Sequence, residues 1–231
     1  MKSKKTVCDL KTCFLCRYCE REWLPAVEAN RKNLYFKKGD IIFREGDTMQ
    51  GMYFVIEGSV KVHKKWGAEK ELIVRFAMAG DILGHRGLGN DTEYPVGATA
   101  LEPVAVCFVD LDFFHASLKM NPAFLFQLMM FFAEELKVSE RKMRDLAHMQ
   151  VKGRVAKALI SLKEKFGEDA AGNINMLVNR QNLASYAGTT YETAFRILND
   201  LIEDRIIRVA GNHISILDNI RITEYTKESN I

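Results

Sequence analysis

The sequence of 231 residues lacks a long hydrophobic run and a secretion signal. No stretch approaches the roughly 18–20 apolar residues that a membrane-spanning helix needs. The charged start, residues 1–5, is not followed by the apolar segment of a signal peptide. These two absences argue against a membrane protein and against secretion, so we expect a cytoplasmic protein with no membrane partner.

An excess of charge of one sign is also missing. The chain has 33 basic and 30 acidic residues, a net charge of +3, which is too small to indicate nucleic-acid binding on its own. Any DNA-binding face must therefore come from local clustering. The sequence has no P-loop, no nucleophile–base set and no His-rich metal motif, and this argues against an enzyme.

The five cysteines are unevenly distributed. Four lie within twelve residues, at Cys8, Cys13, Cys16 and Cys19, and Cys107 stands alone. An odd number of cysteines in a cytoplasmic chain argues against a framework of structural disulfides. Their dense spacing favours a bound metal, a cluster or redox chemistry.

Residues 34–120 have the pattern of an all-β domain. Short apolar or alternating runs are separated by Gly-Asp pairs and other glycine turns. Strands of this length with turns at such regular spacing are typical of a barrel, roll or sandwich. The preceding segment, residues 1–33, carries the clustered cysteines and a helical patch at 20–30 that Pro25 interrupts, so a helix there is short or starts near Pro25.

A long helix is predicted over residues 121–150. Asn121 is a suitable N-cap and Pro122 suits the first helical turn. The apolar positions then follow helical spacing in one stripe: Leu125, Leu128, Phe132, Leu136, Met143 and Leu146. A helix of this length with one stripe favours a partner helix in a dimer; the alternative is that it packs on its own domain.

Residues 151–231 have the pattern of a winged helix-turn-helix. A helix at 151–166 ends at Gly167, and two close helices follow at 180–187 and 191–204. A tight turn, Gly188-Thr189-Thr190, joins these two helices, and a strand pair follows at 206–209 and 213–216. The predicted fold is therefore α+β, with segments 1–33, 34–120, 121–150 and 151–231.

The second of the close helices has the properties of a DNA-recognition helix. Its exposed first turn includes Glu192 and Arg196, which lie four residues apart on one face. A glutamate accepts a hydrogen bond from cytosine N4, and an arginine donates two to guanine. The alternative is a solvated ion pair between these two side chains. We expect the faces that hold the helix pair together to be formed by Leu183, Ala187, Ala194, Ile197, Leu198 and Leu201.

Residues 34–217 resemble the CRP/FNR family of bacterial transcription regulators. The matching stretches include Gly80-Asp81-Ile82-Leu83-Gly84, Lys152-Gly153-Arg154-Val155-Ala156 and, most specifically, Arg180-Gln181 followed by Glu192-Thr193 and Arg196. The resemblance implies a β-roll of the cyclic-nucleotide-binding type (a double-stranded β-helix), a dimerisation helix and a C-terminal winged helix-turn-helix.

The same resemblance implies a homodimer on a two-fold-symmetric duplex DNA site. Glu192 and Arg196 would read base pairs, Arg180 would contact phosphate, and RNA polymerase is a further expected partner. The expected DNA contacts are Arg180, Gln181, Thr190, Tyr191, Glu192, Thr193 and Arg196. The chain departs from the family pattern at Tyr191, a position that helps select the half-site, and at Phe195, where the family has a small residue.

The loop that holds the ligand in the cyclic-nucleotide members also departs from the pattern. Those members have a glutamate where this chain has His85, and an Arg-Ser pair where it has Tyr94 and Pro95. Ser139 retains a hydroxyl on the long helix, but Glu140 replaces the next one. The sequence therefore disfavours cyclic AMP. Gly84, His85, Arg86 and Ser139 are candidate contacts for another anion, and a solvated loop is the alternative.

The cysteines resemble those of the oxygen-sensing members. Cys13, Cys16 and Cys19 offer three thiolates, Cys8 is a substitute, and Cys107 corresponds to the distant fourth ligand. Four thiolates would complete a [4Fe-4S] cluster, although the spacing is shorter than in the best-known oxygen sensors. Zinc, a thiol–disulfide switch and a plain core role for Cys107 are the alternatives. The functional alternative is a regulator that responds to a nucleotide-like or other small anion without a cluster.

Overall fold

The computed structural model describes residues 9–67, 70–176 and 179–227, and the chain forms two compact units, 1–136 and 137–231. The division falls inside the long helix, so the predicted four-segment division stays a prediction. No helix in the described residues is long and apolar enough to cross a membrane.

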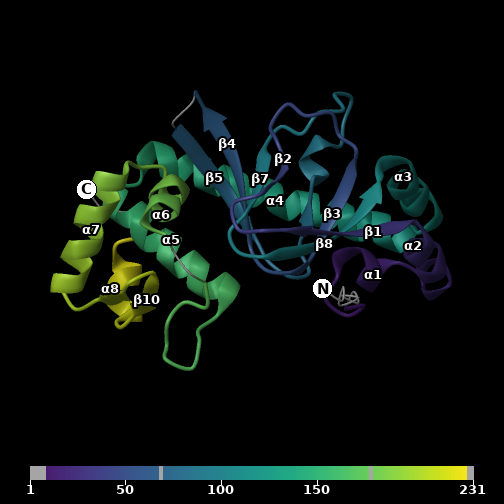
Figure 1. Ribbon diagram of the computed structural model, residues 1–231. Coiled ribbons are helices and arrows are strands. Elements are labelled where there is room, and N and C mark those ends of the chain that lie inside the picture. The colour runs from purple at the N-terminus through teal and green to yellow at the C-terminus, as the bar shows by residue number, and fades with distance from the viewer. Residues whose placement is uncertain (1–8, 68–69, 177–178, 228–231) are drawn as a thin grey trace. The chain divides into compact units, whose positions relative to one another are not determined.

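The first unit contains two four-stranded antiparallel sheets (Figure 1). The first sheet has the order β1-β8-β3-β6 and the second β2-β7-β4-β5. Their strands are β1 Arg31–Phe36, β2 Ile41–Phe43, β3 Gly51–Glu57, β4 Val60–Trp66, β5 Lys70–Ala77, β6 Ile82–Leu83, β7 Gly97–Ala100 and β8 Val104–Asp110. Strand β8 lies between β1 and β3, and its centre pairs Cys107 with Asn33 on one side and with Phe54 on the other. The predicted β-roll is confirmed.

Short helices flank the sheets of this unit: α1 Phe14–Tyr18, the 3-10 turn Arg21–Trp23, α2 Leu24–Asn30, the 3-10 turn His85–Gly87 and α3 Leu111–Met120. Pro25 lies in the first turn of α2, as the sequence predicts. Trp23 donates its indole N–H to Ser117 Oγ at 3.0 Å, and the Glu20 backbone N–H donates to Asn121 Oδ1 at 3.0 Å. These bonds attach the cysteine-bearing segment to α3 and to the start of the long helix. The Asn121 side-chain oxygen thus accepts from the cysteine-bearing segment, and its predicted role as a cap stays a prediction.

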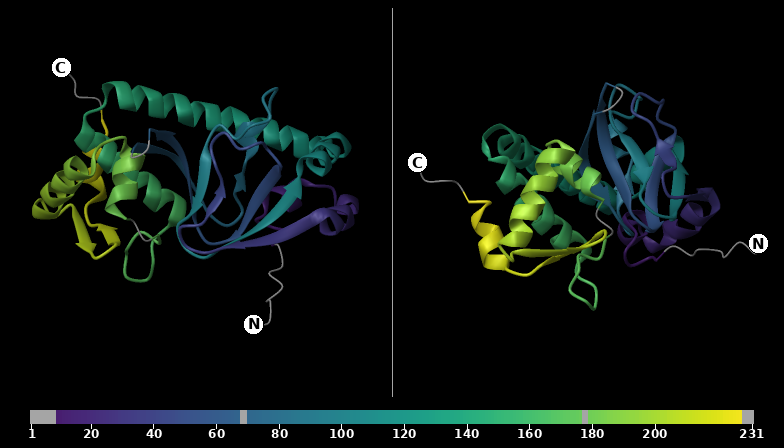
Figure 2. Two further views of the ribbon diagram at one scale, coloured as in Figure 1. Left: turned by 45° about the horizontal axis from the view of Figure 1, so that its top comes forward. Right: turned by 60° about the vertical axis from the view of Figure 1, so that its left-hand side comes forward.

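The long helix α4, Pro122–His148, has two apolar faces rather than the single predicted stripe. Phe124 and Leu128 are buried in the core of the first unit, whose strands lie along the first half of α4 (Figure 2). A second set of side chains is about half exposed: Leu125, Phe126, Met129, Met130, Leu136 and Met143. The predicted stripe is therefore divided, with Leu128 facing the β-roll and Leu125, Leu136 and Met143 facing outward.

The second unit is a winged helix-turn-helix preceded by the end of α4. Its elements are α5 Val151–Phe166, α6 Arg180–Ala187, α7 Tyr191–Glu203, β9 Ile207–Ala210, β10 His213–Ile216 and α8 Asn219–Glu224. Helices α5, α6 and α7 agree with the prediction to within a residue, and α8 was not predicted. The antiparallel pair β9–β10 forms the wing, with Ile207 opposite Ile216, so the first strand starts one residue later than predicted.

Candidate DNA-binding and sensor sites

Local capping interactions determine where the two helices of the DNA-binding motif begin and end. Asn179 caps α6, because its side chain accepts from the backbone N–H groups of Gln181 and Asn182. Gly188 ends α6 in the left-handed region, at φ 65°, where glycine is strongly favoured. Thr190 caps α7, accepting from the Thr193 backbone N–H at 3.3 Å. The turn between the helices is therefore determined by the sequence itself.

The inner faces of the helix pair are those predicted. All six expected core residues are at most 5% exposed: Leu183, Ala187, Ala194, Ile197, Leu198 and Leu201. Their burial fixes which face of α7 is left outside, since residues three and four apart share a face.

The outer face of α7 carries Tyr191, Glu192, Phe195 and Arg196, all exposed. Within the described residues, Glu192 and Arg196 form no ion pair with each other. Their charged ends are open to solvent at the start of the helix, where a recognition helix presents side chains to the major groove. This geometry is compatible with the predicted base contacts.

The remaining predicted DNA contacts lie around the same helix start. Gln181 is exposed in the first turn of α6. The Arg180 guanidinium lies over the Phe195 ring, with its Cζ 5.2 Å from the ring centroid. The Thr190 hydroxyl is occupied by capping and by Thr193 Oγ1, 3.1 Å away. Phosphate contact by Arg180 stays a prediction.

One arginine holds the motif to its support. Arg154 of α5 donates to the backbone carbonyls of Met149, Ala187 and Gly188, so it joins the α4–α5 junction to the end of α6. The neighbouring Gly153 permits close contact with α8, since a Cβ there would lie 2.5 Å from the Tyr225 carbonyl oxygen. The Gly-Arg pair at the start of α5 therefore has two structural roles: Gly153 allows close backbone packing and Arg154 supplies hydrogen bonds to three carbonyls.

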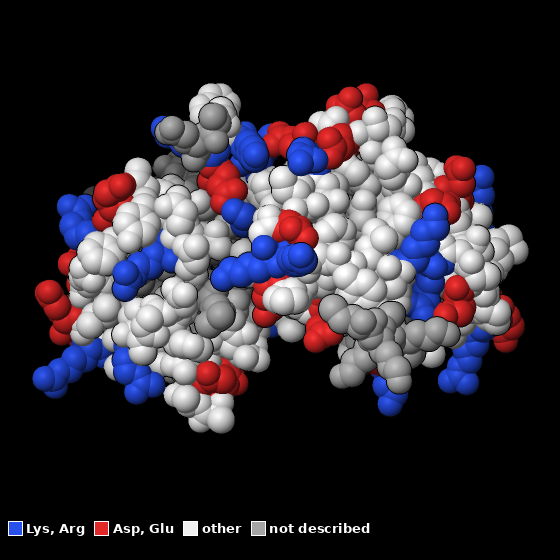
Figure 3. Space-filling model, viewed as in Figure 1, with Lys and Arg blue, Asp and Glu red and all other residues white. Residues whose placement is uncertain are grey.

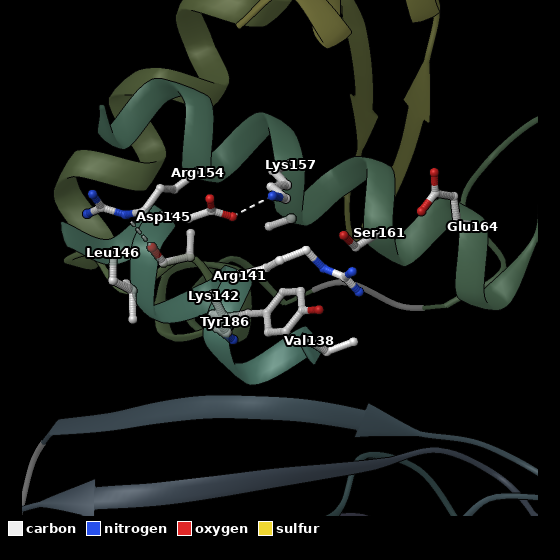
Figure 4. A pocket seen from close by; sticks show the side chains of 12 residues that line it. Val138, Arg141, Lys142, Asp145, Leu146, Arg154, Lys157, Ser161, Glu164 and Tyr186 are labelled. Carbon is white, nitrogen blue, oxygen red and sulfur yellow. Dashed lines mark hydrogen bonds and ion pairs between the residues drawn. The ribbon is translucent and has the colours of Figure 1, made fainter. Parts of the chain in front are cut away.

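A cavity of about 390 Å³ lies within the second unit between the end of α4, α5 and α6. Arg141, Ser161 and Tyr186 come from these three helices, and Asp145 and Lys157 are joined by an ion pair (Figure 4). Asp145 is 7% exposed. The pair ties the end of α4 to α5, which in turn carries the DNA-binding helices.

Basic side chains do not gather into one large patch on the face seen in Figure 3. Lys and Arg alternate there with Asp and Glu. The balanced composition is thus also a balanced surface on this face.

The sensor candidates of the first unit include four buried thiols. In the part of the chain that the structure describes, no disulfide joins Cys13, Cys16, Cys19 or Cys107. Each is at most 8% exposed, and all belong to one hydrophobic core. Cys13 and Cys19 flank α1, Cys16 lies within it, and Cys107 is at the centre of β8. Cys8 lies outside the described residues.

Burial and the proximity of Cys13 raise the pKa of both Cys19 and Cys107 to about 12. The influence of Cys13 on both groups indicates that Cys13 lies near Cys19 and near Cys107. Among the described residues, however, no group of three or more His, Cys, Asp or Glu side chains is arranged to hold a metal ion. The four thiols share a core without forming a ligand set.

The predicted effector loop is buried rather than solvated. His85 is only 3% exposed, and Arg86 donates to Glu135 of α4 at 2.7 Å. Arg75 Nη1 and His85 Nε2 lie 3.8 and 3.7 Å from the same carboxylate. Three basic side chains of the β-roll thus converge on one carboxylate of the long helix, Glu135, which no sequence pattern indicates. Ser139 belongs to the second unit and stays a prediction.

The charge state of this cluster follows from its surroundings. Burial raises the pKa of Glu135, but contact with His85 and the charges of Arg75 and Arg86 outweigh it, so that the pKa falls to about 2. Burial and the two arginines lower the pKa of His85. At neutral pH the cluster therefore contains an ionised Glu135 and a neutral His85.

Tyr94, which the resemblance places where the cyclic-nucleotide members have an arginine, lies in the core of the β-roll. It is 2% exposed, donates its hydroxyl to the Gly51 carbonyl oxygen at 2.8 Å and stacks on Phe43 at 4.2 Å between ring centroids. A core tyrosine offers no cation to a phosphodiester, which is in line with the expectation that cyclic AMP is disfavoured.

We expect His85→Gln to flatten the pH dependence of stability of the first unit. In the unfolded chain the imidazole titrates near ~6.5, and in the folded chain its pKa is lower. The stabilisation is therefore complete above ~6.5 and is lost as pH falls towards the folded pKa, by up to about 1.4 kcal/mol per pH unit. Urea unfolding at several values between pH 5 and 7.5, followed by the fluorescence of Trp23 and Trp66, measures it.

His115→Gln is the matched control, because His115 is exposed on α3. Subtracting each variant's curve from that of the unmodified chain removes the contribution of the carboxylates. An unchanged pH slope in His85→Gln would contradict a neutral, buried His85.

Two family models match the chain: the cyclic nucleotide-binding domain over residues 33–121 and the Crp-like helix-turn-helix domain over residues 153–223. The transcriptional activator protein Anr of Pseudomonas aeruginosa is 27% identical over 188 residues, covering 80% of this chain and 77% of that protein. A CRP-like cAMP-activated global transcriptional regulator of Mycobacterium tuberculosis is 25% identical over 189 residues, covering 81% and 84%.

The fold is also similar to a solved structure. FixK2 from Bradyrhizobium japonicum superposes with a TM-score of 0.77 at 22% identity, covering 86% of this chain and 98% of that chain. The two matched domains correspond to the β-roll and to the winged helix-turn-helix. The two relatives are about equally similar to this chain, and only one of them is described as cAMP-activated, so overall similarity does not identify the signal.

Proposed function

The chain belongs to the CRP/FNR family of transcription regulators, and we propose that it binds a two-fold-symmetric duplex as a homodimer, with Glu192 and Arg196 reading the bases. The observation that carries the proposal is the outer face of α7. There a carboxylate and a guanidinium are exposed one turn apart on a helix whose inner face is fully buried. RNA polymerase is a further partner that rests on the resemblance alone.

Selection of duplexes from a random pool tests this function. We expect an inverted repeat whose half-sites are about one helical turn apart, because each subunit presents one α7 to the major groove. Binding to the selected duplex should exceed binding to random duplex by at least ~10³-fold, and both affinities should fall with salt. Recovery of sequences with no shared motif would refute the function.

The second face of α4 supports the dimer. Phe126, Met129, Leu136 and Met143 are 53–61% exposed, and their spacing of three, seven and seven keeps them on one side of the helix. An apolar strip of this kind is costly in water and is typical of an interface. A second copy of α4 would cover it.

We expect Leu136→Glu to convert the dimer to a monomer, because it would place two carboxylates in an apolar interface. Light scattering coupled to size-exclusion chromatography measures the mass, and the dimer dissociation constant should rise by at least ~100-fold. Leu10→Glu makes the same chemical change at a 53% exposed leucine outside α4 and should leave the mass unchanged. A dimeric Leu136→Glu variant would exclude this face as the interface.

For the signal, we propose an oxygen- or redox-sensitive iron–sulfur cluster held by Cys13, Cys16, Cys19 and Cys107, with Cys8 as substitute. The donor chemistry is suitable, because thiolates are the usual ligands of such clusters and four thiols lie in one buried core. No three of the described thiols are grouped as metal ligands, so binding of a cluster would have to bring them closer together. A bound cluster would supply a redox-active, oxygen-labile group. Iron analysis and absorbance near ~400 nm after anaerobic purification test it, and a colourless, iron-free protein would refute it.

A route from these thiols to the dimer helix lies within the first unit. Phe14, next to Cys13, contacts two rings of α4, Phe124 at 6.1 Å and Phe131 at 5.2 Å between centroids. Phe131 in turn contacts His85 at 4.9 Å. A change at the thiols would therefore act on α4 through aromatic packing, close to the carboxylate that the β-roll holds.

The second candidate is a regulator that responds to a small anion at Gly84, His85 and Arg86 of the first unit. The observation that favours it is the convergence of Arg75, His85 and Arg86. Glu135 lies at the centre of these groups and accepts from Arg86 Nη2 at 2.7 Å. Arg75 Nη1 and His85 Nε2 are buried without a hydrogen-bond partner among the described residues, so an anion would have to replace Glu135 or bind beside it. Calorimetry with cyclic nucleotides and with inorganic phosphate separates the two candidates. Heat of binding to iron-free protein would support the anion-responsive regulator and not the cluster.

A further inference from the structure

Two large aromatic side chains lie unexpectedly on the outer face of α7. Tyr191 is 39% and Phe195 37% exposed, and their rings stack with centroids 6.1 Å apart and planes inclined by 12°. Aromatic side chains carry large apolar areas whose exposure to water is costly, so a paired exposure on a functional helix marks a contact surface.

The pair shares its surface with the proposed base-reading residues. Tyr191 and Phe195 are four residues apart, as are Glu192 and Arg196, and the two pairs are adjacent in sequence on the exposed side of one helix. Any duplex that reaches Glu192 and Arg196 in its major groove therefore also meets the aromatic pair.

The aromatic surface is held in place before DNA arrives. The Arg180 guanidinium lies over the Phe195 ring at 5.2 Å, which adds a cation–π contact to the stacking of the two rings. Phe195 is therefore in contact with a neighbour from α6 as well as with Tyr191. Such a surface loses little conformational freedom on binding.

We propose that Tyr191 and Phe195 together form an apolar surface that reads the 5-methyl group of thymine, at a base pair next to those contacted by Glu192 and Arg196. This inference rests on the proposed function. In the major groove, the thymine methyl is the one apolar group that distinguishes a base pair. Phe195 has no polar group and Tyr191 has only its hydroxyl, so most of the surface can make only apolar contacts, and these match the methyl.

The test replaces thymine by deoxyuridine in the selected duplex, one position at a time. The replacement removes the methyl group and leaves every hydrogen-bonding group unchanged. We expect one thymine in each half-site at which the change weakens binding by about three- to tenfold, as loss of one buried methyl predicts. Fluorescence anisotropy at fixed salt measures the affinity.

Variants assign the effect to the pair. In Tyr191→Ala and in Phe195→Ala, affinity should no longer depend on that methyl, while replacement of the guanine read by Arg196 should still weaken binding. Tyr191→Phe keeps the ring and should keep the methyl preference. Asn199→Ala, at an exposed position further along α7, is the matched control and should behave as the unmodified chain.

The outcomes of these experiments distinguish failure of the methyl-reading inference from failure of the proposed function. If no deoxyuridine substitution weakens binding, or if the preference persists in both alanine variants, the inference is wrong while the proposed function stands. If the unmodified chain shows no preference for any sequence, the proposed function is wrong and the inference with it.

Discussion

Replacing Arg196 by alanine is expected to remove most of the preference of the protein for its operator over random duplex. A bidentate arginine–guanine contact contributes about 1–3 kcal/mol of discrimination. A dimer loses two such contacts, so specific affinity should fall by roughly 30-fold to 10⁴-fold. Binding to random duplex uses phosphate contacts and should change by only a few-fold. Anisotropy titrations on both duplexes at several salt concentrations measure the two effects separately.

The structure makes this variant a clean test. Arg196 is exposed and, in the part of the chain that the structure describes, forms no ion pair, so its removal should leave thermal stability unchanged. Arg21→Ala removes the same charge from an exposed position in the first unit and should leave the operator preference intact. An equal loss on operator and random duplex would show that Arg196 acts only through its charge.

The DNA-binding unit was predictable because local interactions determine it. Asn179, Gly188 and Thr190 set the ends of α6 and α7 through bonds to their own neighbours. The hydrophobic spacing then identified the six buried residues of the helix pair. Capping and periodicity act over three or four residues, which is the range that a single sequence reports well.

The long helix was predicted as an element but not in its packing. Its apolar residues fit one stripe by spacing, yet Leu128 is buried in the first unit while Leu136 is exposed. Asn121 accepts from Glu20, about 100 positions earlier in the chain. Such contacts depend on which distant segments meet, and periodicity along one helix carries no information about them.

The buried charge cluster shows the same limit at a site. The sequence identified His85 and Arg86 from their place in the glycine loop, with a solvated loop as the alternative. The structure buries His85 and brings in Arg75 from β5 and Glu135 from α4. Residue spacing cannot identify Glu135 as the partner of these three basic groups, because they lie 49 to 60 positions away in the chain.

Replacing Cys107 by alanine is expected to remove bound iron from the anaerobically purified protein. Cys107 is the one described cysteine outside the N-terminal segment, and at the centre of β8 it is fully buried. If it supplies the fourth thiolate, its loss leaves three ligands, and iron content and absorbance near ~400 nm should fall to about a tenth or less. Operator binding under anaerobic conditions should weaken in parallel, since the proposed cluster acts on α4 and α4 forms the proposed dimer interface.

Loss of iron from Cys107→Ala is informative only if the variant stays folded. Cysteine to alanine removes one sulfur atom from a core, a change that usually costs about 1–2 kcal/mol, so the variant should stay folded with a melting temperature lower by a few degrees. Cys8→Ala is the matched control, since Cys8 is the cysteine proposed as a substitute, and it should retain iron. Full iron content in Cys107→Ala would place the fourth ligand elsewhere. Iron-free protein in all forms, with operator binding intact, would leave Cys107 as a buried strand residue whose thiol packs as any small apolar side chain does.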